Sequence, residues 1–314
     1  MHPLTGLYTA ATALRNTLFD RGVLASRRLE QPVVSVGNLS VGGAGKTPFV
    51  IALGELLKAR GIRFDVLSRG YRRKTRGVLI VEPDGSAADF GDEPLLIARR
   101  LGVPVIVGES RYDAGRVAER KFQPQLHVLD DGFQHRSLHR DFDIVLMTER
   151  DFGDRMLPSG RLREPLSSLT RADAVVLPAD LGVDHPALRQ KPIWRIERSL
   201  VLPRMPSAPV VFCGIARPEQ FFAQVRAAGI APAAEVSFRD HHAYDLDDIQ
   251  ALVSARIKLD AGGFLTTEKD AINLAPEQHC LEPLAVAVLN LTLDRPADVV
   301  DAILARIEDR KPRS

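Results

Sequence analysis

Residues 37–50 read Gly-Asn-Leu-Ser-Val-Gly-Gly-Ala-Gly-Lys-Thr-Pro-Phe-Val and follow the apolar run from Pro32 to Val36. A β-type run, a glycine-rich loop ending in Gly-Lys-Thr and a helix-forming stretch are typical of a phosphate-binding P-loop. In such a loop, backbone N–H groups and a helix N-terminus surround a polyphosphate. The strict pattern has glycine where this chain has Ser40. We therefore expect a nucleotide site at Gly42, Gly43, Ala44, Gly45, Lys46, Thr47 and Pro48.

The alternation of apolar β-type runs with helix-like stretches predicts the fold class. From residue 32 to about 180 it indicates an α/β domain with a mainly parallel sheet flanked by helices, as in P-loop NTPases. Proline then recurs, and a short strand is expected at Ile193–Ile196. A second, smaller α/β alternation follows. We predict an N-terminal helix within 1–30, a kinase-type domain over 31–185, a linker over 186–208 and a second domain over 209–314.

Composition excludes several classes of protein. With 45% hydrophobic and 26% charged residues, the chain of 314 residues is typical of a globular protein. A formal net charge of +2 gives no general attraction to nucleic acid, so no nucleic-acid partner is expected. The two cysteines, Cys213 and Cys280, lack metal-ligand spacing and favour a reducing compartment. The sequence contains no run of 18 apolar residues, so we predict no membrane-spanning helix. The start of the chain does not resemble a secretion signal.

The N-terminal segment has an apolar stripe at helical spacing. Arginines lie within the stripe and directly after it, at Arg15, Arg21, Arg27 and Arg28. Two interpretations remain open, a helix packed on the first domain or a helix lying on an anionic membrane surface. The stripe consists of Leu4, Leu7, Tyr8, Ala11, Leu14, Leu18 and Phe19.

A second candidate site follows the apolar strand Leu126–Leu129, where the chain continues Asp130-Asp131-Gly132. P-loop enzymes hold Mg²⁺ with an acidic residue at such a strand end, close to the Lys-Thr end of the loop. Asp-Asp-Gly is also a common turn. Downstream of a P-loop, however, the arrangement favours metal binding by Asp130 and Asp131.

Other clusters are less specific when taken singly. Five cations lie between Arg69 and Arg76 at a strand end, which favours contact with an anionic substrate, although a solvated surface is the usual interpretation. Asp92 in Gly-Asp-Glu-Pro begins a helix, where acidic residues are ordinary caps. The charges of Thr-Thr-Glu-Lys-Asp, residues 266–270, are typical of surface salt bridges.

Together these segments resemble the tetraacyldisaccharide 4'-kinase family, the lipid A kinases of Gram-negative bacteria. The family's own loop also lacks the first P-loop glycine, so Ser40 fits it. The matching motifs occur in the expected order over most of the chain, within residues 34–271. They are Gly37–Pro48, Ser68–Arg73, Gly91–Pro94, Val128–His135, Gly160–Pro165, Phe238–Tyr244 and Thr266–Ala271.

The resemblance implies transfer of the γ-phosphoryl group of ATP to the 4'-hydroxyl of a tetraacyl glucosamine disaccharide 1-phosphate, a lipid A precursor. The enzyme would act peripherally at the cytoplasmic face of the inner membrane, with no obligate protein partner. By motif, Lys46 and Thr47 bind the triphosphate and Mg²⁺, Asp130 and Asp131 organise the metal, and Glu164 assists the metal or the nucleotide.

Asp92 would then be the general base, oriented by a histidine of the Asp-His-His segment. We choose His241, with His242 as the alternative. An imidazole next to Asp92 can orient it and, when protonated, stabilise its anionic form. Arg69, Tyr71 and Arg72 suit the substrate's 1-phosphate or the anionic leaflet.

Two other functions are compatible with a P-loop. A GTPase-like switch would need an Asn-Lys-x-Asp segment, which the sequence does not contain. The remaining alternative is a P-loop ATPase or ligase that acts on a soluble substrate. The amphipathic N-terminus and the basic cluster between Arg69 and Arg76 argue mildly against it.

Overall fold

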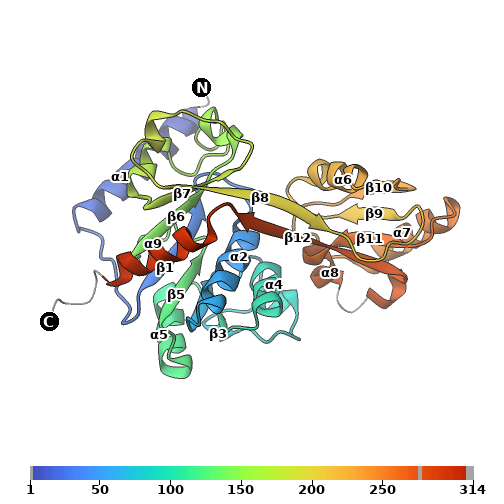
Figure 1. Cartoon of the computed structure of the whole chain (residues 1–314), viewed down its shortest axis with the longest axis horizontal. Coiled ribbons are helices and arrows are strands. Elements are labelled where there is room, and N and C mark those ends of the chain that lie inside the picture. Colours follow the sequence, from blue (N-terminus) through green and yellow to red (C-terminus); the bar gives the residue numbers. More distant parts are fainter. Residues whose placement is uncertain (1–2, 275–277, 309–314) are drawn as a thin grey trace.

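The computed structural model describes residues 3–274 and 278–308, and its strands form one 12-stranded sheet (Figure 1). The order is β10-β9-β11-β12-β8-β7-β6-β1-β5-β2-β4-β3. The first-half strands are β1 (Val33–Asn38), β2 (Phe64–Ser68), β3 (Leu79–Ile80), β4 (Val105–Val107), β5 (Leu126–Asp130), β6 (Phe142–Leu146) and β7 (Ala174–Pro178). The remaining strands are β8 (Ile193–Val201), β9 (Val210–Cys213), β10 (Ala234–Ser237), β11 (Phe264–Thr267) and β12 (Leu284–Leu293).

Most of the strand pairs are parallel. In the described part of the chain, only β12 with β8 and β3 with β4 pair antiparallel. Strands β1, β2 and β5 are buried along their whole length, as expected for strands covered by helices on both faces. The predicted α/β class with a mainly parallel sheet is confirmed.

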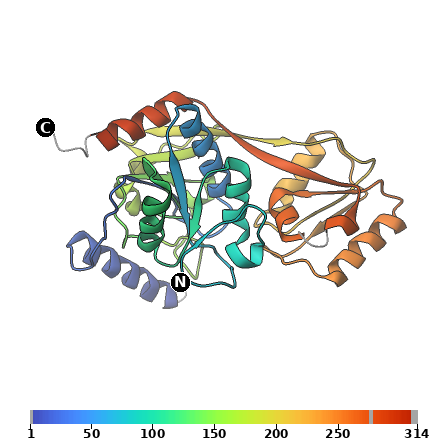
Figure 2. The same cartoon turned by 90° about the horizontal axis from the view of Figure 1, so that it is seen from below.

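Helices cover both faces of the sheet. They are α1 (Pro3–Asp20), α2 (Lys46–Ala59), α3 (Ala87–Phe90), α4 (Asp92–Leu101), α5 (Arg111–Phe122), α6 (Pro218–Ala227), α7 (Leu246–Lys258), α8 (Glu268–Leu274) and α9 (Pro296–Glu308). Short 3₁₀ turns lie at Glu149–Phe152, Leu166–Arg171, Pro186–Leu188 and Gln278–Leu281. Helices α1 and α9 lie on opposite sides of the first half (Figure 2).

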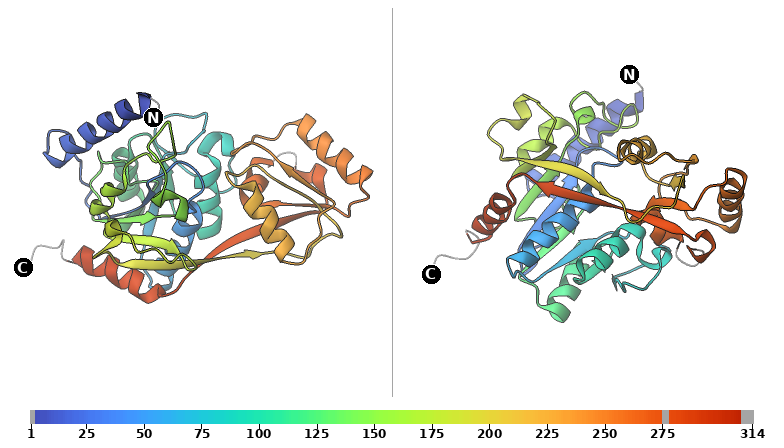
Figure 3. Two further views of the ribbon diagram at one scale, coloured as in Figure 1. Left: turned by 90° about the horizontal axis from the view of Figure 1, so that it is seen from above. Right: turned by 45° about the vertical axis from the view of Figure 1, so that its right-hand side comes forward.

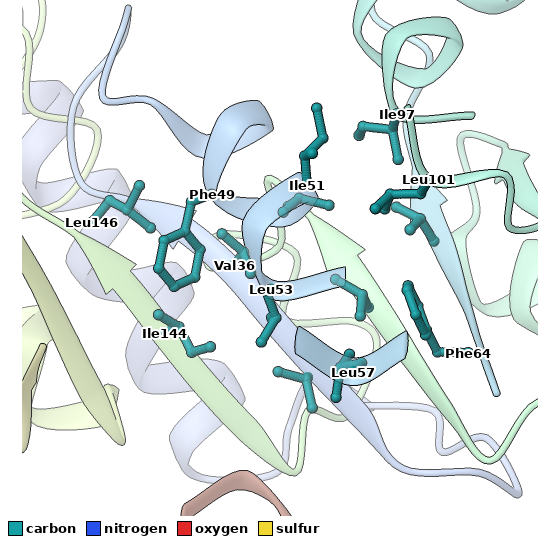
Figure 4. Packing of buried hydrophobic residues seen from close by; sticks show 14 of the residues in the cluster. Val36, Phe49, Ile51, Leu53, Leu57, Phe64, Ile97, Leu101, Ile144 and Leu146 are labelled. Carbon is teal, nitrogen blue, oxygen red and sulfur yellow. The ribbon is translucent and has the colours of Figure 1, made fainter. Parts of the chain in front are cut away.

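The main core lies between the first-half strands and the helices α2, α4 and α9 (Figure 4). Phe49 and Leu53 of α2 are fully buried against Val36 of β1 and Ile144 of β6. This packing fixes the start of α2, and therefore the end of the glycine-rich loop, against the centre of the sheet. A second cluster joins α5 to the other face, through Ala114 and Ala118.

Strands β8 and β12 run side by side from the first half of the molecule to the second (Figure 3). Strand β8 has nine residues and occupies much of the predicted 186–208 linker, where only a short strand was expected. The packing of the last helix, which the sequence did not indicate, is also clear. Helix α9 packs on the first half through Val299, Val300 and Ile303. The domain boundaries stay a prediction.

No helix within the described ranges, 3–274 and 278–308, has the length and apolar character needed to cross a membrane.

Candidate functional site

The glycine-rich loop leads from the buried end of β1 into α2, with Gly45 at the N-cap. Gly45 has φ +88°, a left-handed conformation that glycine adopts without strain, and no side chain caps the helix. The first N–H groups of α2 therefore point out of the helix without a side-chain acceptor, as an anion site requires. Ser40, at the position of the missing glycine, is buried and forms a β-bridge with Leu162.

Lys46 lies beside a carboxylate at the end of β5. Its Nζ donates to Asn38 Oδ1 at 3.1 Å and lies 3.5 Å from Asp131 Oδ1. Arg163 donates to both carboxylate oxygens of Asp131, at 3.1 and 2.9 Å. Burial opposes ionisation, but Lys46 and Arg163 outweigh it and hold the pKa of Asp131 well below its usual range. Asp131 is therefore a carboxylate at neutral pH.

Asp130 is in a different state from its neighbour. It is 2% exposed, and its Oδ2 accepts a hydrogen bond from Ser68 Oγ at 3.1 Å. Its Oδ1 is buried and has no hydrogen-bond partner in the described part of the chain. Burial, with the charges of Glu93 and Asp131, raises the pKa of Asp130 to about 7. A buried oxygen without a donor, near Lys46, fits a bound cation.

The described residues do not contain a group of three His, Cys, Asp or Glu side chains placed to hold a metal. Magnesium does not require one, because it keeps several water ligands and in kinase sites uses one or two carboxylates together with substrate phosphates. Asp130, Asp131 and the nearly buried Thr47 therefore fit Mg²⁺ bound together with a nucleotide.

The second predicted centre, Asp92 with His241, is brought together from residues far apart in the sequence. His241 Nδ1 lies 2.7 Å from Asp92 Oδ2, and Asp92 is 5% exposed. Gly91 has φ +88°, and a Cβ there would lie 3.0 Å from the carbonyl oxygen of Tyr71, so only glycine fits before Asp92. His241 itself has φ +57°, an uncommon conformation for a residue with a side chain and one found more often at functional sites.

His242 is directed elsewhere. Its Nε2 lies 2.7 Å from Asp248, at the start of α7. Of the two adjacent histidines, the structure places His241 next to Asp92.

Lys269 and Asn273 of α8 complete the surroundings of Asp92. Lys269 Nζ lies 3.2 Å from His241 Nε2 and 3.8 Å from Asp92 Oδ2, and Asn273 donates to Asp92 Oδ2 at 3.3 Å. Burial opposes ionisation of Asp92, but the hydrogen bond from His241 and the charge of Lys269 lower its pKa. The sequence interpretation of residues 266–270 as surface charge therefore missed Lys269, whose side chain is only 17% exposed.

Two of the three residues predicted to bind substrate, Arg72 and Tyr71, contact the histidine segment. Arg72 donates to the backbone carbonyls of Asp240 and His241, at 2.8 and 2.9 Å. The Tyr71 ring packs edge-on against the His241 imidazole, with centroids 5.4 Å apart. Both residues therefore hold the histidine segment in this structure.

Arg69 belongs to a separate cationic cluster. Burial and the charge of Arg69 lower the pKa of Arg111 to about 10. Burial, with Arg111 and Arg140 the strongest of the nearby charges, lowers the pKa of His135 to about 4. Arg111 and His135 had not been singled out from the sequence. The cluster concentrates positive charge within electrostatic range of Asp130 and Asp131.

Glu164 is almost completely buried, at 1% exposure, on the side of the first half that α1 covers. It accepts a hydrogen bond from Asn16 Nδ2 at 2.7 Å and pairs with Arg171. Among the hydrogen bonds and ion pairs described for Glu164, none involves Asp130, Asp131 or Thr47. Its Oε1 is buried without a hydrogen-bond partner in the described part of the chain, but no contact joins it to the other predicted metal ligands.

Arg198 of β8 lies over the glycine-rich loop. Its Nη2 donates to the carbonyl oxygen of Ala44 at 2.9 Å, and a Cβ on Gly45 would approach the same nitrogen to 2.8 Å. The Arg198 Nε is buried without a partner among the described residues. This arginine, whose position no sequence motif indicated, places a positive charge against the expected phosphate site.

Comparison with known proteins gives a consistent result. A family model described as tetraacyldisaccharide-1-P 4'-kinase matches residues 1–308. Curated relatives named tetraacyldisaccharide 4'-kinase include one from Koribacter versatilis, 48% identical over 99% of this chain and 100% of the relative. Another, from Geobacter metallireducens, is 40% identical over 94% of each chain. A crystal structure of LpxK from Aquifex aeolicus in complex with ATP superposes with a TM-score of 0.80 and 36% identity, over 97% of this chain and 98% of that chain.

Proposed function

The chain belongs to the tetraacyldisaccharide-1-phosphate 4'-kinase family, and on that premise we infer that it is an ATP-dependent kinase acting on a lipid A precursor. It transfers the γ-phosphoryl group of ATP to the 4'-hydroxyl of a tetraacyl glucosamine disaccharide 1-phosphate. The observation that carries this proposal, besides the family match, is the pairing of Asp92 with His241 in the same molecule as the Lys46 loop.

The donor half of the proposed site is the glycine-rich loop. The N–H groups at the start of α2 and Lys46 bind the β- and γ-phosphates, and the Arg198 guanidinium adds positive charge from β8. Thr47, Asp130 and Asp131 are the proposed Mg²⁺ ligands, and the ion, when bound, neutralises charge on the phosphates. Arg163 and Lys46 keep Asp131 ionised for this task.

The acceptor half uses Asp92 as general base. As the 4'-oxygen attacks the γ-phosphorus, its proton passes to Asp92, and the bond between the γ-phosphorus and the bridging oxygen breaks to release ADP. With its pKa lowered, Asp92 is present at neutral pH as the anion, which is the form that accepts a proton, but it is a weak base. Positioning supplies much of the rate in phosphoryl transfer, so the contacts that fix Asp92 are part of the proposed mechanism.

The basic cluster gives a proposed binding site for the 1-phosphate of the acceptor. Arg69 is the candidate from the predicted set, because Arg72 is engaged with the backbone at Asp240 and His241 and Tyr71 packs on His241. Glu164 stays a predicted metal ligand.

Helix α1 supports the proposal of peripheral attachment to the cytoplasmic face of the inner membrane. Tyr8 Oη donates to the carbonyl oxygen of Arg163, and Asn16 donates to Glu164, so one side of the helix docks on the first half. Leu7 and Leu14 are 67% and 61% exposed. The two interpretations of the stripe are therefore compatible, since the docked helix leaves large leucines on its outer surface for an anionic bilayer.

A product assay tests the proposed function. Purified protein is incubated with γ-labelled ATP, Mg²⁺ and a detergent-dispersed tetraacyldisaccharide 1-phosphate, and the lipid fraction is separated by thin-layer chromatography. We expect a labelled bisphosphorylated lipid that disappears in K46M and persists in K258M, a change at an exposed lysine at the end of α7. ATP consumption that depends on a soluble acid, with no labelled lipid, would instead support the ligase alternative.

A further inference from the structure

Lys269 is a nearly buried cation that contacts both members of the Asp92–His241 pair. Strand β11 ends at Thr267, and α8 begins directly at Glu268, so the position of Lys269 in the first turn is set by the sheet. Its Nζ lies 3.4 Å from Glu93 Oε1 and 3.6 Å from Asp240 Oδ1, in addition to its contacts with Asp92 and His241. The lysine therefore lies at the centre of three carboxylates and one imidazole.

The chemistry of these neighbours determines where the imidazole carries its proton. A carboxylate only accepts hydrogen bonds and an ammonium only donates them. His241 Nδ1 at 2.7 Å from Asp92 must therefore carry a hydrogen, and Nε2 at 3.2 Å from Lys269 Nζ must be an acceptor. Asp240 Oδ2 also faces Nε2, but at 3.8 Å it lies beyond hydrogen-bonding distance, whereas Lys269 lies within it. Only the neutral imidazole with its hydrogen on Nδ1 satisfies the two hydrogen bonds. This differs from the protonated partner that the sequence had suggested as the stabiliser of Asp92.

We propose that Lys269 is a positioning residue of the phosphotransfer reaction, which fixes His241 as the neutral Nδ1–H tautomer and supplies the positive charge that keeps Asp92 ionised. The inference rests on the proposed role of Asp92 as general base. Lys269 acts through the two side chains that it contacts rather than on the substrate.

The charge balance around Lys269 supports this role. The groups that face Asp92 are Glu93 of its own helix, the 240–241 segment with Asp240 and His241, and Lys269 and Asn273 of α8. Burial opposes the charged form of Lys269, but Glu93, Asp92 and Asp240 outweigh it and raise the pKa of the lysine. Without Lys269, these three carboxylates would lose the cation that contacts all of them, and the proton-accepting form of Asp92 would be less favoured.

The alternative is that Lys269 merely ties α8 to α4. Such a tie would affect folding stability, and activity only in proportion to it, and would leave the ionisation of Asp92 unchanged. The two roles therefore differ in the pH at which Asp92 ionises and in the tautomer of the His241 ring.

Kinetics of K269M, K269R and the matched surface control K258M test the proposal. We expect K269M to lower kcat about 100-fold and to leave KM for ATP within about twofold. In an NMR titration of the side-chain carboxyls, the Asp92 signal, identified by its loss in D92N, should titrate about one pH unit higher in K269M, because loss of a cation makes Asp92 harder to ionise. K269R keeps the charge, so it should restore the titration of Asp92, and K258M should match the unchanged protein.

A second readout does not depend on kinase activity. In ¹⁵N-histidine spectra, the signal lost in H241N identifies His241, and its nitrogen shifts should report hydrogen on Nδ1 and an accepting Nε2. In K269M the Nε2 shift should change, because it loses the ammonium donor. An Nε2–H tautomer in the unchanged protein, or an Asp92 carboxyl that titrates at the same pH in folded K269M, would overturn the proposal. Absence of lipid phosphorylation by the unchanged protein would instead overturn the proposed function and leave the His241 spectrum as an independent test of the contact.

Discussion

A buried charge cluster at the opposite end of β5 from Asp130 allows a quantitative prediction of stability. His127 is fully buried, and its Nδ1 lies 2.9 Å from both carboxylate oxygens of Asp65 on β2. Its Nε2 lies 3.5 Å from Glu119 of α5. Burial acts against the imidazolium, but the hydrogen bonds to Asp65 and the nearby Glu119 carboxylate outweigh it and raise the pKa of His127 to about 9. The buried, protonated His127 ring therefore links β5 to Asp65 of β2 and to Glu119 of α5.

The size of the effect follows from linkage. The pKa of His127 is about 9 in the folded protein and 6.5 in the unfolded chain. The contribution of His127 to the free energy of unfolding is therefore complete below pH 6.5 and is lost as the pH rises through 9. The difference corresponds to about 3 kcal/mol in full, and most of it is present at pH 7. H127Q, which cannot take up the proton, should lose this amount at pH 7 together with the cost of leaving the buried Asp65, whose pKa burial raises, without its partner.

Urea denaturation of the unchanged protein and H127Q, followed by circular dichroism at pH 7 and pH 10, measures both parts. The gap in unfolding free energy should shrink by about 2–3 kcal/mol between the two pH values. H139Q, which removes a partly exposed histidine, is the control and should show no comparable change. A gap for H127Q that is the same at both pH values would refute the argument that His127 is held protonated by Asp65 and Glu119.

Three further predictions concern the site and the outer surface of α1. D92N should lower kcat by about 10²–10⁴ and leave KM for ATP nearly unchanged in initial-rate assays, because it removes the base but not the loop. A rise in KM for ATP by the same factor as the fall in kcat would contradict the role of Asp92 as general base. R198M should raise KM for ATP about tenfold with little change in melting temperature, and an unchanged KM would show that the guanidinium does not contact the phosphates. L7E/L14E should no longer float with anionic vesicles and should keep its activity on detergent-dispersed substrate, since both leucines are exposed; undiminished flotation would exclude this surface.

Much of the fold could be predicted from the sequence, because the strands are short buried runs separated by clear helical stretches. The main element that was underestimated is β8, expected as Ile193–Ile196 and found as Ile193–Val201. Its outer half alternates between exposed and partly buried residues, and the neighbouring prolines suggested a linker. The pairing of β8 with β12 is a contact between distant segments, which no local pattern shows.

Prediction of the site residues was limited by the same lack of long-range information. The sequence placed Asp92 and His241 in one site through the order of family motifs, and the structure brings them to hydrogen-bonding distance. The role of Lys269 could not be seen, because a lysine among charged residues is usually solvated and its burial depends on the docking of α8. Arg72 illustrates the opposite case: its charge suggested a phosphate ligand, and its guanidinium is occupied by backbone carbonyls.

The way α8 docks explains why base and partners are assembled as a unit. Residues 269, 272 and 273 lie on one face of the helix, since positions three and four apart are neighbours. Ile272 is 4% exposed and belongs to the core of the first half, whereas Lys269 and Asn273 on either side of it contact Asp92. Asp270 points to the second half instead, where it accepts hydrogen bonds from Tyr244 Oη and from Gly214 N, and the Gly214 carbonyl in turn accepts from His241 N. One short helix therefore fixes the carboxylate through one face and the backbone of the histidine through the other. A shift of α8 relative to α4 would separate Lys269 and Asn273 from Asp92, while Asp270 kept its contacts with the second half, so the orientation of Asp92 depends on the two halves being docked.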